Sequence, residues 1–330
     1  MKRGLTILTI LGVLALSQLC AGNETALDRY VRTPDPSFNY TLVSTRKIEG
    51  ATWYLLQFTS QNWRSSSEVN RTEWQHWLTI IRPDATAHGT GFLLISGGNR
   101  DDAPPAEPNP ELRKLAETSR SVVAEVRMVP NQPFVFSDDT ADRREDAFIT
   151  YTWDKFLRGG DEQWPARLPM TKSAVRAMDV VTQFCASAAG GAIEVNRFVV
   201  SGASKRGWTA WTTAAVDHRV AAIVPLVSEV LNLDRFYDHQ YRSLGFWLPA
   251  DKDYTRIGVH DQAGSARWRE LMRIEDPYEY RDRLTLPKLL INSAGDEYRP
   301  ADSTQLFWDD LKGPKFLRYV PNVGHALRAS

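Results

Sequence analysis

Residues 197–207 read RFVVSGASKRG, and this stretch decides how the rest of the chain is interpreted. The apolar run 198–200 is typical of a buried strand, and a turn of small residues follows it with Ser204 at the apex. In a nucleophile elbow a strand ends in a strained turn that exposes the serine hydroxyl, and a helix begins at once. Small residues are needed where the backbones pass closely, and Gly202 and Gly207 supply them. The stretch therefore predicts a strand, a nucleophilic Ser204 and a helix.

One residue of this turn departs from the usual G-x-S-x-G pattern, but the segments that follow support a nucleophile elbow. Arg206 occupies the position of the second glycine, and Gly207 comes one residue later. Apolar residues then repeat at helical spacing from Trp208 to Ala215, and the run 220–227 predicts another buried strand. The alternative is an ordinary strand–helix unit in which Ser204 only caps the helix.

Composition sets broad limits on function. The chain has 330 residues, 42% of them hydrophobic and 24% charged, which is sufficient for a large α/β domain with its own core. Forty basic and forty acidic residues cancel, so there is no electrostatic footprint for wrapping nucleic acid. The chain has no cysteine cluster and no H-E-x-x-H motif, so we expect no metal and no cofactor.

The N-terminus has the parts of a secretory signal. Basic residues precede the apolar run from Leu5 to Leu16, and small residues follow around Ala21. We therefore predict a cleaved signal peptide over residues 1–22 and a secreted or periplasmic protein. A lipoprotein signal at Cys20 is the alternative, although larger residues than usual precede that cysteine. No later stretch reaches the length of about 20 apolar residues that a membrane-spanning helix needs, and Cys185 would be the only thiol left for a disulfide.

The pattern of strands and helices predicts an α/β fold of the α/β-hydrolase type. Segments 40–47 and 52–58 alternate as a hairpin does, and 77–82 reads as a further strand. After these, strands alternate with helices, which implies a mostly parallel central sheet with helices on both faces. The expected strands are 92–95, 121–126, the run 197–200 before the elbow, 220–227, 288–292 and 315–320, and the expected helices are 111–118, 169–188 and about 303–311.

Two long insertions interrupt this alternation, at about 128–168 and 228–284. Segments that follow parallel strands lie at the carboxyl edge of the sheet, where ligands bind in such folds. We therefore expect residues 23–330 to form a single domain whose insertions border the site.

A serine hydroxyl is a weak nucleophile, so it needs a histidine to take its proton and a carboxylate to orient that histidine. In α/β-hydrolases the order along the chain is Ser, then Asp or Glu, then His. The strand 288–292 leads into Asp296, and the strand 315–320 leads into His325. Each of these side chains thus follows a parallel strand, which predicts a catalytic triad with Ser204.

Alternatives exist for each member of this triad. Asp296 is favoured over Glu297 because it directly follows Gly295, and Glu229 after the strand 220–227 is a further candidate. Asp296 is also suited to cap the next helix, and His325 to an ordinary loop position.

The negative oxygen of the reaction intermediate needs two hydrogen-bond donors. We expect the first to be the backbone N–H of Lys205 and the second to come from the loop after 92–95, at Gly98. The Lys205 ammonium has two interpretations of its own. It either helps to hold an anionic substrate or pairs with a neighbouring carboxylate.

With these residues in place, the chain resembles the PhoPQ-activated pathogenicity-related protein family, a group of exported α/β-hydrolase-like proteins. The resemblance implies a nucleophile at Ser204, an acid at Asp296 and a base at His325. Members usually continue beyond this histidine, so a shortened member or a truncated product is expected. The segments that carry the resemblance are 26–31, 77–80, 129–133, 151–156 (YTWDKF), 168–172, 202–208 (GASKRGW), 293–297 (SAGDE), 308–311 and 317–322.

A second resemblance is confined to the elbow, which is similar to the G-C-S-R-x-G elbow of glucuronoyl esterases. It implies that a basic neighbour of the serine suits esters of acidic sugars. Further arginines are candidates to add positive charge near the site or to form surface ion pairs: Arg127, Arg206, Arg235 and Arg242.

Together these features predict a secreted serine hydrolase, an esterase rather than a peptidase, that acts on a small-molecule or carbohydrate ester. The alternative is a non-catalytic exported binding or host-interaction protein on the same scaffold. A third interpretation is carbohydrate binding by aromatic residues of the insertions, although such residues more often pack the loops themselves. Those residues are Trp153, Trp164, Tyr237, Tyr241 and Trp247.

Overall fold

The computed structural model describes residues 24–328, and within this range nine strands form one sheet in the order β1-β2-β3-β5-β4-β6-β7-β8-β9. The pairs β1–β2, β2–β3 and β3–β5 are antiparallel, and all other neighbours are parallel. The strands are β1 (Asn39–Ile48), β2 (Ala51–Asn62), β3 (Glu73–Pro83), β4 (Thr90–Ile95), β5 (Val123–Val126), β6 (Arg197–Ala203), β7 (Val220–Leu226), β8 (Lys288–Ser293) and β9 (Lys315–Val320).

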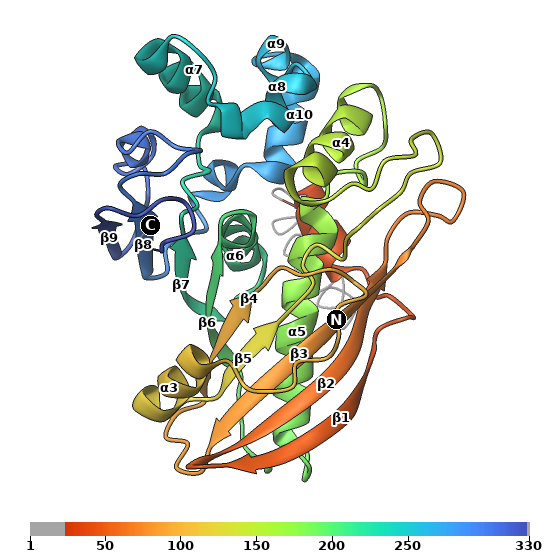
Figure 1. Ribbon diagram of the computed structural model, residues 1–330, viewed down its shortest axis with the longest axis vertical. Coiled ribbons are helices and arrows are strands. Elements are labelled where there is room, and N and C mark those ends of the chain that lie inside the picture. Colours follow the sequence, from red (N-terminus) through yellow and green to blue (C-terminus); the bar gives the residue numbers. More distant parts are fainter. Residues whose placement is uncertain (1–23, 329–330) are drawn as a thin grey trace, which may run out of the picture.

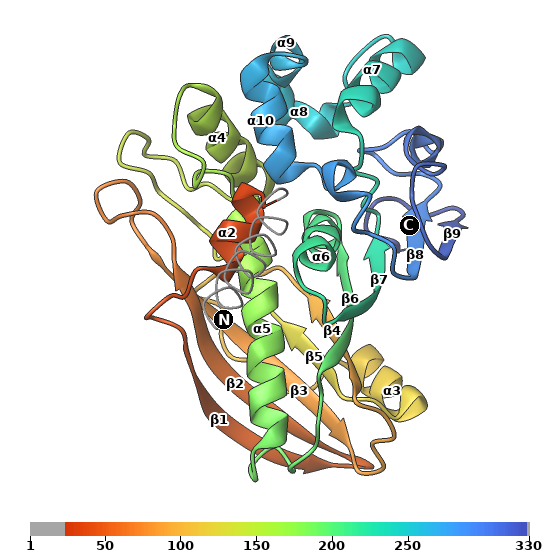
Figure 2. The same cartoon turned by 180° about the vertical axis from the view of Figure 1, so that it is seen from behind.

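Helices cover both faces of the sheet (Figures 1 and 2). The helices α2, α5 and α6 pack against one another on one face, and α3 packs against β3 and β5. The α-helices are α2 (Ala26–Arg32), α3 (Pro110–Ser119), α4 (Glu145–Leu157), α5 (Arg167–Ala186), α6 (Lys205–Val216), α7 (Leu233–Leu244), α8 (Lys252–Arg256), α9 (Val259–Gln262) and α10 (Ala266–Glu275). The short 3-10 helices are η2 (Pro249–Asp251), η3 (Pro277–Tyr280) and η4 (Ser303–Leu306).

Alternation along β2 explains why the sheet is covered on both sides. Tyr54 and Leu56 belong to the larger core cluster, which includes residues of α5 and α6. Trp53 and Leu55 belong to a second cluster that contains Leu112 of α3. Successive side chains of a strand point to opposite faces, so a continuous apolar run serves two cores. The mostly parallel sheet with helices on both faces is the predicted α/β architecture.

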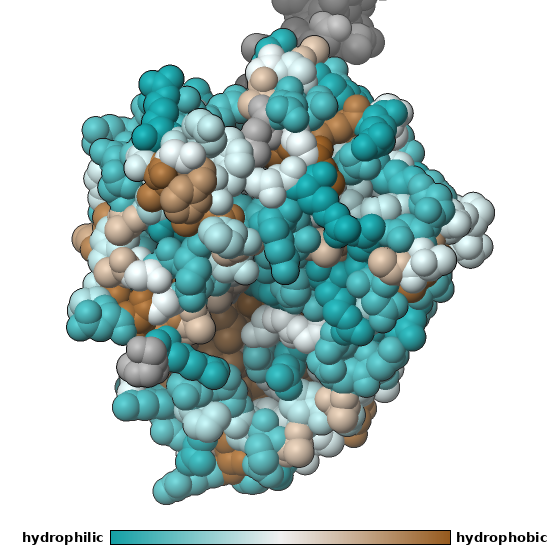
Figure 3. Space-filling model, turned by 45° about the horizontal axis from the view of Figure 1, so that its top comes forward, coloured by the Kyte–Doolittle hydropathy of each residue, from teal (hydrophilic) through white to brown (hydrophobic). Residues whose placement is uncertain are grey.

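The two insertions gather at one end of the sheet, the upper end in Figure 1. The first contains α4, and the second contains α7 to α10. The surface over this end is mainly hydrophilic, with small apolar patches between polar residues (Figure 3). The predicted strands 220–227, 288–292 and 315–320 correspond to β7, β8 and β9, which differ from them by at most one residue at an end.

The expected helix over 303–311 is wrong beyond its first turn. Only the 3-10 helix η4 forms, and Phe307 leaves the helical conformation with a φ of −142°. The side chain of Thr304 donates a hydrogen bond to Glu229 at 2.6 Å, and Phe307 and Leu311 are buried. Tertiary contacts of this segment therefore override its local helical pattern.

The predicted signal peptide, residues 1–22, lies outside the described residues. In the part of the chain that is described, no helix combines the length and apolar character needed to cross a bilayer. Cys185 is buried and unpaired.

We predict that Gly207→Ala destabilises the protein by about 1–3 kcal/mol. A Cβ at this position would lie 2.6 Å from the Ser228 Cβ and 2.8 Å from the Gly202 carbonyl oxygen, so α6 could not stay as close to β6 and β7. Urea unfolding measures the change. Gly89→Ala is the matched control, because its Cβ would meet nothing closer than 3.5 Å. Equal stability of the two variants would contradict the prediction.

Candidate active site

Ser204 lies between β6 and α6 in a backbone conformation that few non-glycine residues adopt. Its φ is 56° and its ψ is −126°, and its N–H donates to the Leu226 carbonyl of β7 at 2.8 Å. Such a residue costs about 1–3 kcal/mol and persists only where its surroundings enforce it. Gly202 and Gly207 allow the close approach, since a Cβ on either would lie 2.6 Å from a neighbouring atom. The local geometry is that of the predicted strand, strained turn and helix.

The two adjacent carboxylates after β8 hold His325 in different ways. Asp296 Oδ2 lies 2.7 Å from His325 Nδ1, and Glu297 Oε2 accepts the backbone N–H of His325 at 2.7 Å. Because a carboxylate only accepts hydrogen bonds, Nδ1 carries the proton and Nε2 is left as an acceptor. The Asp296 side chain is fully buried.

The loop that carries His325 is attached to the loop after β8 by further hydrogen bonds. The Val323 carbonyl accepts from the Gly295 N–H at 3.1 Å and from the Ser293 hydroxyl. The Ala294 N–H donates to Val320 at 3.0 Å. The position of His325 is therefore fixed from β8 as well as from β9.

Ser204 and His325 line one small pocket, with a volume of about 20 Å³. His325 Nε2 is buried and has no hydrogen-bond partner among the described residues. The apolar part of the wall includes Trp208, Val227 and Val230. The structure thus places Ser204 and His325 on one pocket and Asp296 at the other imidazole nitrogen, and among the described residues Ser204 makes no hydrogen bond with His325 Nε2.

Charged side chains beside Ser204 are paired with one another. Lys205 Nζ lies 3.0 Å from Glu145 and 3.2 Å from Asp146, and Arg206 binds both oxygens of Glu145 at 2.6 Å. Burial alone would raise the pKa of Glu145, but Arg206 and Lys205 bring it down to about 2. Of the two interpretations of the Lys205 ammonium, the structure has the one in which it pairs with carboxylates.

The predicted hydrogen-bond donors for the intermediate differ in their placement. Lys205 is the first residue of α6, so its N–H is one of those that lack an acceptor within the helix. Gly98 does not line the pocket, and a Cβ on it would meet Asp102 and Met128. The Arg206 guanidinium lies against Gly97, where a Cβ would come within 2.6 Å of it. The role of both donors stays a prediction.

Glu229 lies behind the site and has other partners than His325. Its Oε1 accepts from Thr304 at 2.6 Å and from Tyr319 at 2.8 Å, and its Oε2 is buried without a partner among the described residues. Burial raises the pKa of Glu229 to about 7; these two hydroxyls oppose the shift, and the charge of Asp296 adds to it.

Sequence reasoning missed several residues in and around the site. Arg299 lines the pocket and bonds the Tyr298 carbonyl at 2.9 Å, Glu145 holds both Lys205 and Arg206, and Val227 has a φ of 42°. Proximity to the SAGDE segment was the only sequence signal for Arg299. Nothing in the local sequence indicates the partners of Glu145, which lies in the first insertion.

The other predicted arginines and aromatic residues do not line the pocket. Arg206 is bound to Glu145, Arg242 to Asp238 at 2.8 Å, and Arg127 lies 3.9 Å from Glu125. The aromatic residues of the insertions divide into two groups. Trp153, Trp164 and Tyr237 are buried in the core, whereas Tyr241 is exposed and Trp247 partly so.

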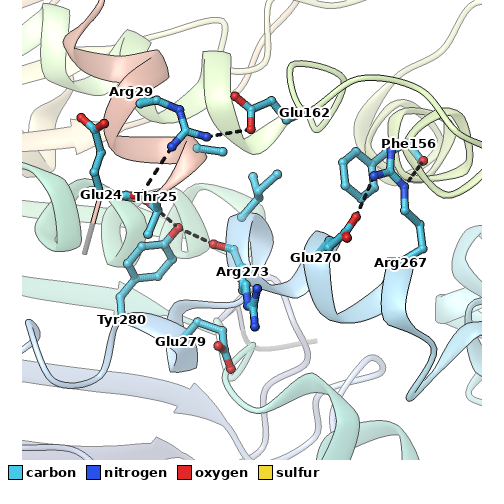
Figure 4. Close-up of a pocket in the computed structure, with 12 residues that line it drawn as sticks. Glu24, Thr25, Arg29, Phe156, Glu162, Arg267, Glu270, Arg273, Glu279 and Tyr280 are labelled. Atoms are coloured by element: carbon cyan, nitrogen blue, oxygen red, sulfur yellow. Dashed lines mark hydrogen bonds and ion pairs between the residues drawn. The ribbon is translucent and has the colours of Figure 1, made fainter. Parts of the chain in front are cut away.

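A larger pocket of about 460 Å³ lies between α2, α10 and η3 (Figure 4). It contains neither Ser204 nor His325, and several of its charged groups are paired, such as Arg29 with Glu162 at 2.7 Å. Within residues 24–328, no three His, Cys, Asp or Glu side chains are grouped so that they could hold a metal ion.

Comparison with known sequences gives two matches over most of the chain. The model of the PhoPQ-activated pathogenicity-related protein family matches residues 27–330. Autocrine proliferation repressor protein A of Dictyostelium discoideum is 40% identical over 324 residues, which cover 96% of this chain and 64% of that protein. This chain therefore spans less than two thirds of the length of that relative.

Solved structures of esterases have the same fold. An acetyl xylan esterase from a Paenibacillus species superposes with a TM-score of 0.60 and 16% identity, over 92% of this chain and 90% of that one. Acetyl xylan esterase 1 from a Thermoanaerobacterium species gives 0.56 and 14%, over 91% and 86%. A glucuronoyl esterase from Solibacter usitatus gives 0.51 and 15%, over 88% and 82%. At these identities the likeness is one of fold, and it confirms the predicted α/β-hydrolase fold.

We predict that Glu229→Gln stabilises the protein more at pH 8 than at pH 5, by about 2–3 kcal/mol. The folded-state pKa of about 7 exceeds the ordinary value of 4.5, so the folded state binds the proton more tightly than the unfolded state. The contribution of Glu229 to stability therefore falls as the pH rises from about 4.5 to 7. Above about pH 7 the destabilisation by ionised Glu229 stays at its full value.

Urea unfolding of both proteins at the two pH values measures this difference. Subtracting the wild-type curve removes the contribution of Asp276, whose pKa burial also raises to about 7. A stability difference between the proteins that is the same at both pH values would contradict the prediction.

Proposed function

Since the chain belongs to the PhoPQ-activated pathogenicity-related protein family and has the α/β-hydrolase fold, we propose that it is a serine hydrolase that cleaves esters through an acyl-enzyme. One observation carries the proposal. The strained Ser204 and the unpartnered Nε2 of His325 line the same pocket, and Asp296 holds the other nitrogen of that imidazole at 2.7 Å. This arrangement has the parts that activate a serine hydroxyl.

In the proposed reaction, Ser204 Oγ attacks the ester carbonyl carbon while His325 Nε2 takes the hydroxyl proton. The C–O bond to the leaving group then breaks, and His325 gives the proton to the departing alcohol. Water repeats the sequence on the acyl-enzyme and releases the acid. Asp296 holds the imidazole in the required tautomer and stabilises its positive charge in each half of the reaction.

The N-terminus of α6 supplies electrostatic support for the intermediate. The N–H of Lys205 directly follows the nucleophile and has no acceptor within the helix. We propose it as one donor to the oxyanion, with the loop at Gly98 supplying the second after a local adjustment. The positive end of the helix dipole favours negative charge at this place.

We infer an exported enzyme with a small-molecule or carbohydrate ester as its substrate. The N-terminal pattern of residues 1–22 supports export. Acetyl xylan and glucuronoyl esterases share the fold, which supports the substrate class. The charge pairs of Lys205 and Arg206 with Glu145 leave neither cation free, so they do not favour an acidic sugar.

A binding function is the second candidate, and one observation favours it. The relative that is 40% identical is named for repression of proliferation, and this name specifies no chemical reaction. In that case the hydrolase fold would present a surface to a partner, and Ser204 would not react.

Labelling with a fluorophosphonate separates these two candidates. We expect the wild-type protein to gain one probe by intact mass and both Ser204→Ala and His325→Ala to gain none, because the histidine activates the serine. Circular dichroism checks that the variants are folded. A folded wild-type protein that is labelled neither by this probe nor by the smaller methanesulfonyl fluoride would overturn the hydrolase in favour of the binding protein.

Asp296 and Glu297 should differ in their effect on ester hydrolysis. We predict a loss of about 10³–10⁴-fold in kcat for Asp296→Asn, because the amide favours the wrong imidazole tautomer. Glu297→Gln should lose less than about tenfold, because its amide oxygen still accepts the His325 backbone N–H. Steady-state kinetics on one activated ester tests both. A larger loss in Glu297→Gln than in Asp296→Asn would refute the assignment.

A further inference from the structure

The free volume beside Ser204 limits what can bind there. The pocket that holds Ser204 and His325 measures about 20 Å³, which leaves little room for a substrate group. A methyl group is similar in size to a water molecule, and each further methylene of an acyl chain adds about that volume again. We propose that the site accepts only esters of one- and two-carbon acids, formyl and acetyl groups. This inference deepens the proposed hydrolase function and rests on it.

Trp208 forms a wall that cannot move aside easily. It comes one helical turn after Ser204, and helical side chains lean toward the N-terminus, so its indole lies over the turn that carries Ser204. Its Nε1 donates to the Glu275 carbonyl, and the Arg167 guanidinium lies 4.2 Å from its ring centroid. The Trp153 ring packs against it edge-on at 5.9 Å. The indole is thus fixed by contacts on several sides.

Val227 and Val230 close another part of the pocket. Val227 has a φ of 42°, unusual for a β-branched residue, and its N–H donates to the Ile291 carbonyl of β8 at 2.8 Å. Val230 is 3% exposed. Val227 is therefore held by its backbone bond to β8, and Val230 by its burial.

The remaining lining is unsuited to a long alkyl chain. Asp146, Lys205 and Arg299 line the same pocket, and Tyr254 donates to Asp146 at 3.2 Å. An acyl chain directed toward them would remove charged groups from water without replacing their hydrogen bonds, which is unfavourable. Both the apolar and the charged parts of the wall thus favour a short acyl group.

Hydrolysis of p-nitrophenyl acetate, butyrate and octanoate tests the proposal. We expect kcat/KM for acetate to exceed that for butyrate by at least about tenfold, the discrimination that one or two methylenes produce against a rigid wall. Val227→Gly and Val230→Ala should each raise the butyrate-to-acetate ratio by about tenfold or more. Glycine adopts a positive φ without strain, so Val227→Gly widens the pocket and keeps the backbone. Val43→Ala, on the exposed face of β1, is the matched control and should leave the ratio unchanged.

The outcomes separate this inference from the proposed function. Wild-type hydrolysis of butyrate or octanoate at the acetate rate would overturn the short-acyl assignment and leave the hydrolase standing. Widening variants that are folded, hydrolyse acetate and keep the wild-type ratio would overturn it as well. If no ester is cleaved and Ser204 also fails to react with methanesulfonyl fluoride, the hydrolase function falls and this inference with it.

Discussion

Ser204 is held with a φ of 56° and a ψ of −126°, a strained backbone conformation that relaxes unless neighbouring groups hold it in place. The opposing groups come from several elements. β7 accepts the Ser204 N–H, α6 packs closely on β6 through Gly207, and Arg167 of α5 donates to the Lys205 carbonyl at 2.9 Å. The strained turn is therefore a property of the assembled sheet and its helices, and a peptide of the same sequence would not keep it.

The imidazole depends on a different part of the sheet. β8 and β9 are parallel neighbours with a continuous register from Lys288 to Ser293, so the loops that follow them emerge side by side. Asp296 and Glu297 then fix the ring and the backbone of His325, respectively. One pair of parallel strands thus places the acid and the base, while β6 and α6 place the serine. The site lies where the loops after β8 and β9 meet the turn between β6 and α6.

Sequence patterns were sufficient for the residues whose place follows from strand order. Ser204 directly follows β6, Asp296 and His325 lie in the loops after β8 and β9, and parallel strands bring such positions to one edge. The roles of Glu145 and Arg299 could not be predicted in this way, because they depend on how an insertion and a loop pack in space. The segment 303–311 shows the same limit, since contacts of Thr304 and Phe307 outweigh its helical pattern. Sequence favoured Asp296 over Glu297 and Glu229 only by its place after Gly295, and their hydrogen-bond partners in the structure separate the three.

The second insertion is tied to the rest of the molecule at several buried points. Arg167 of α5 and Glu275 of α10 form an ion pair at 3.2 Å, with both side chains fully buried. Removing either partner would leave the other charge buried and unpaired, at a cost of about 3–5 kcal/mol. The start of α7 and the turn before α8 have anchors of their own: Asp276 accepts the N–H groups of Asn232 and Leu233, and Arg299 lies 3.4 Å from the buried Asp251. The helices of this insertion could therefore leave the site only if several buried contacts at separate points broke together, so they would move as one unit.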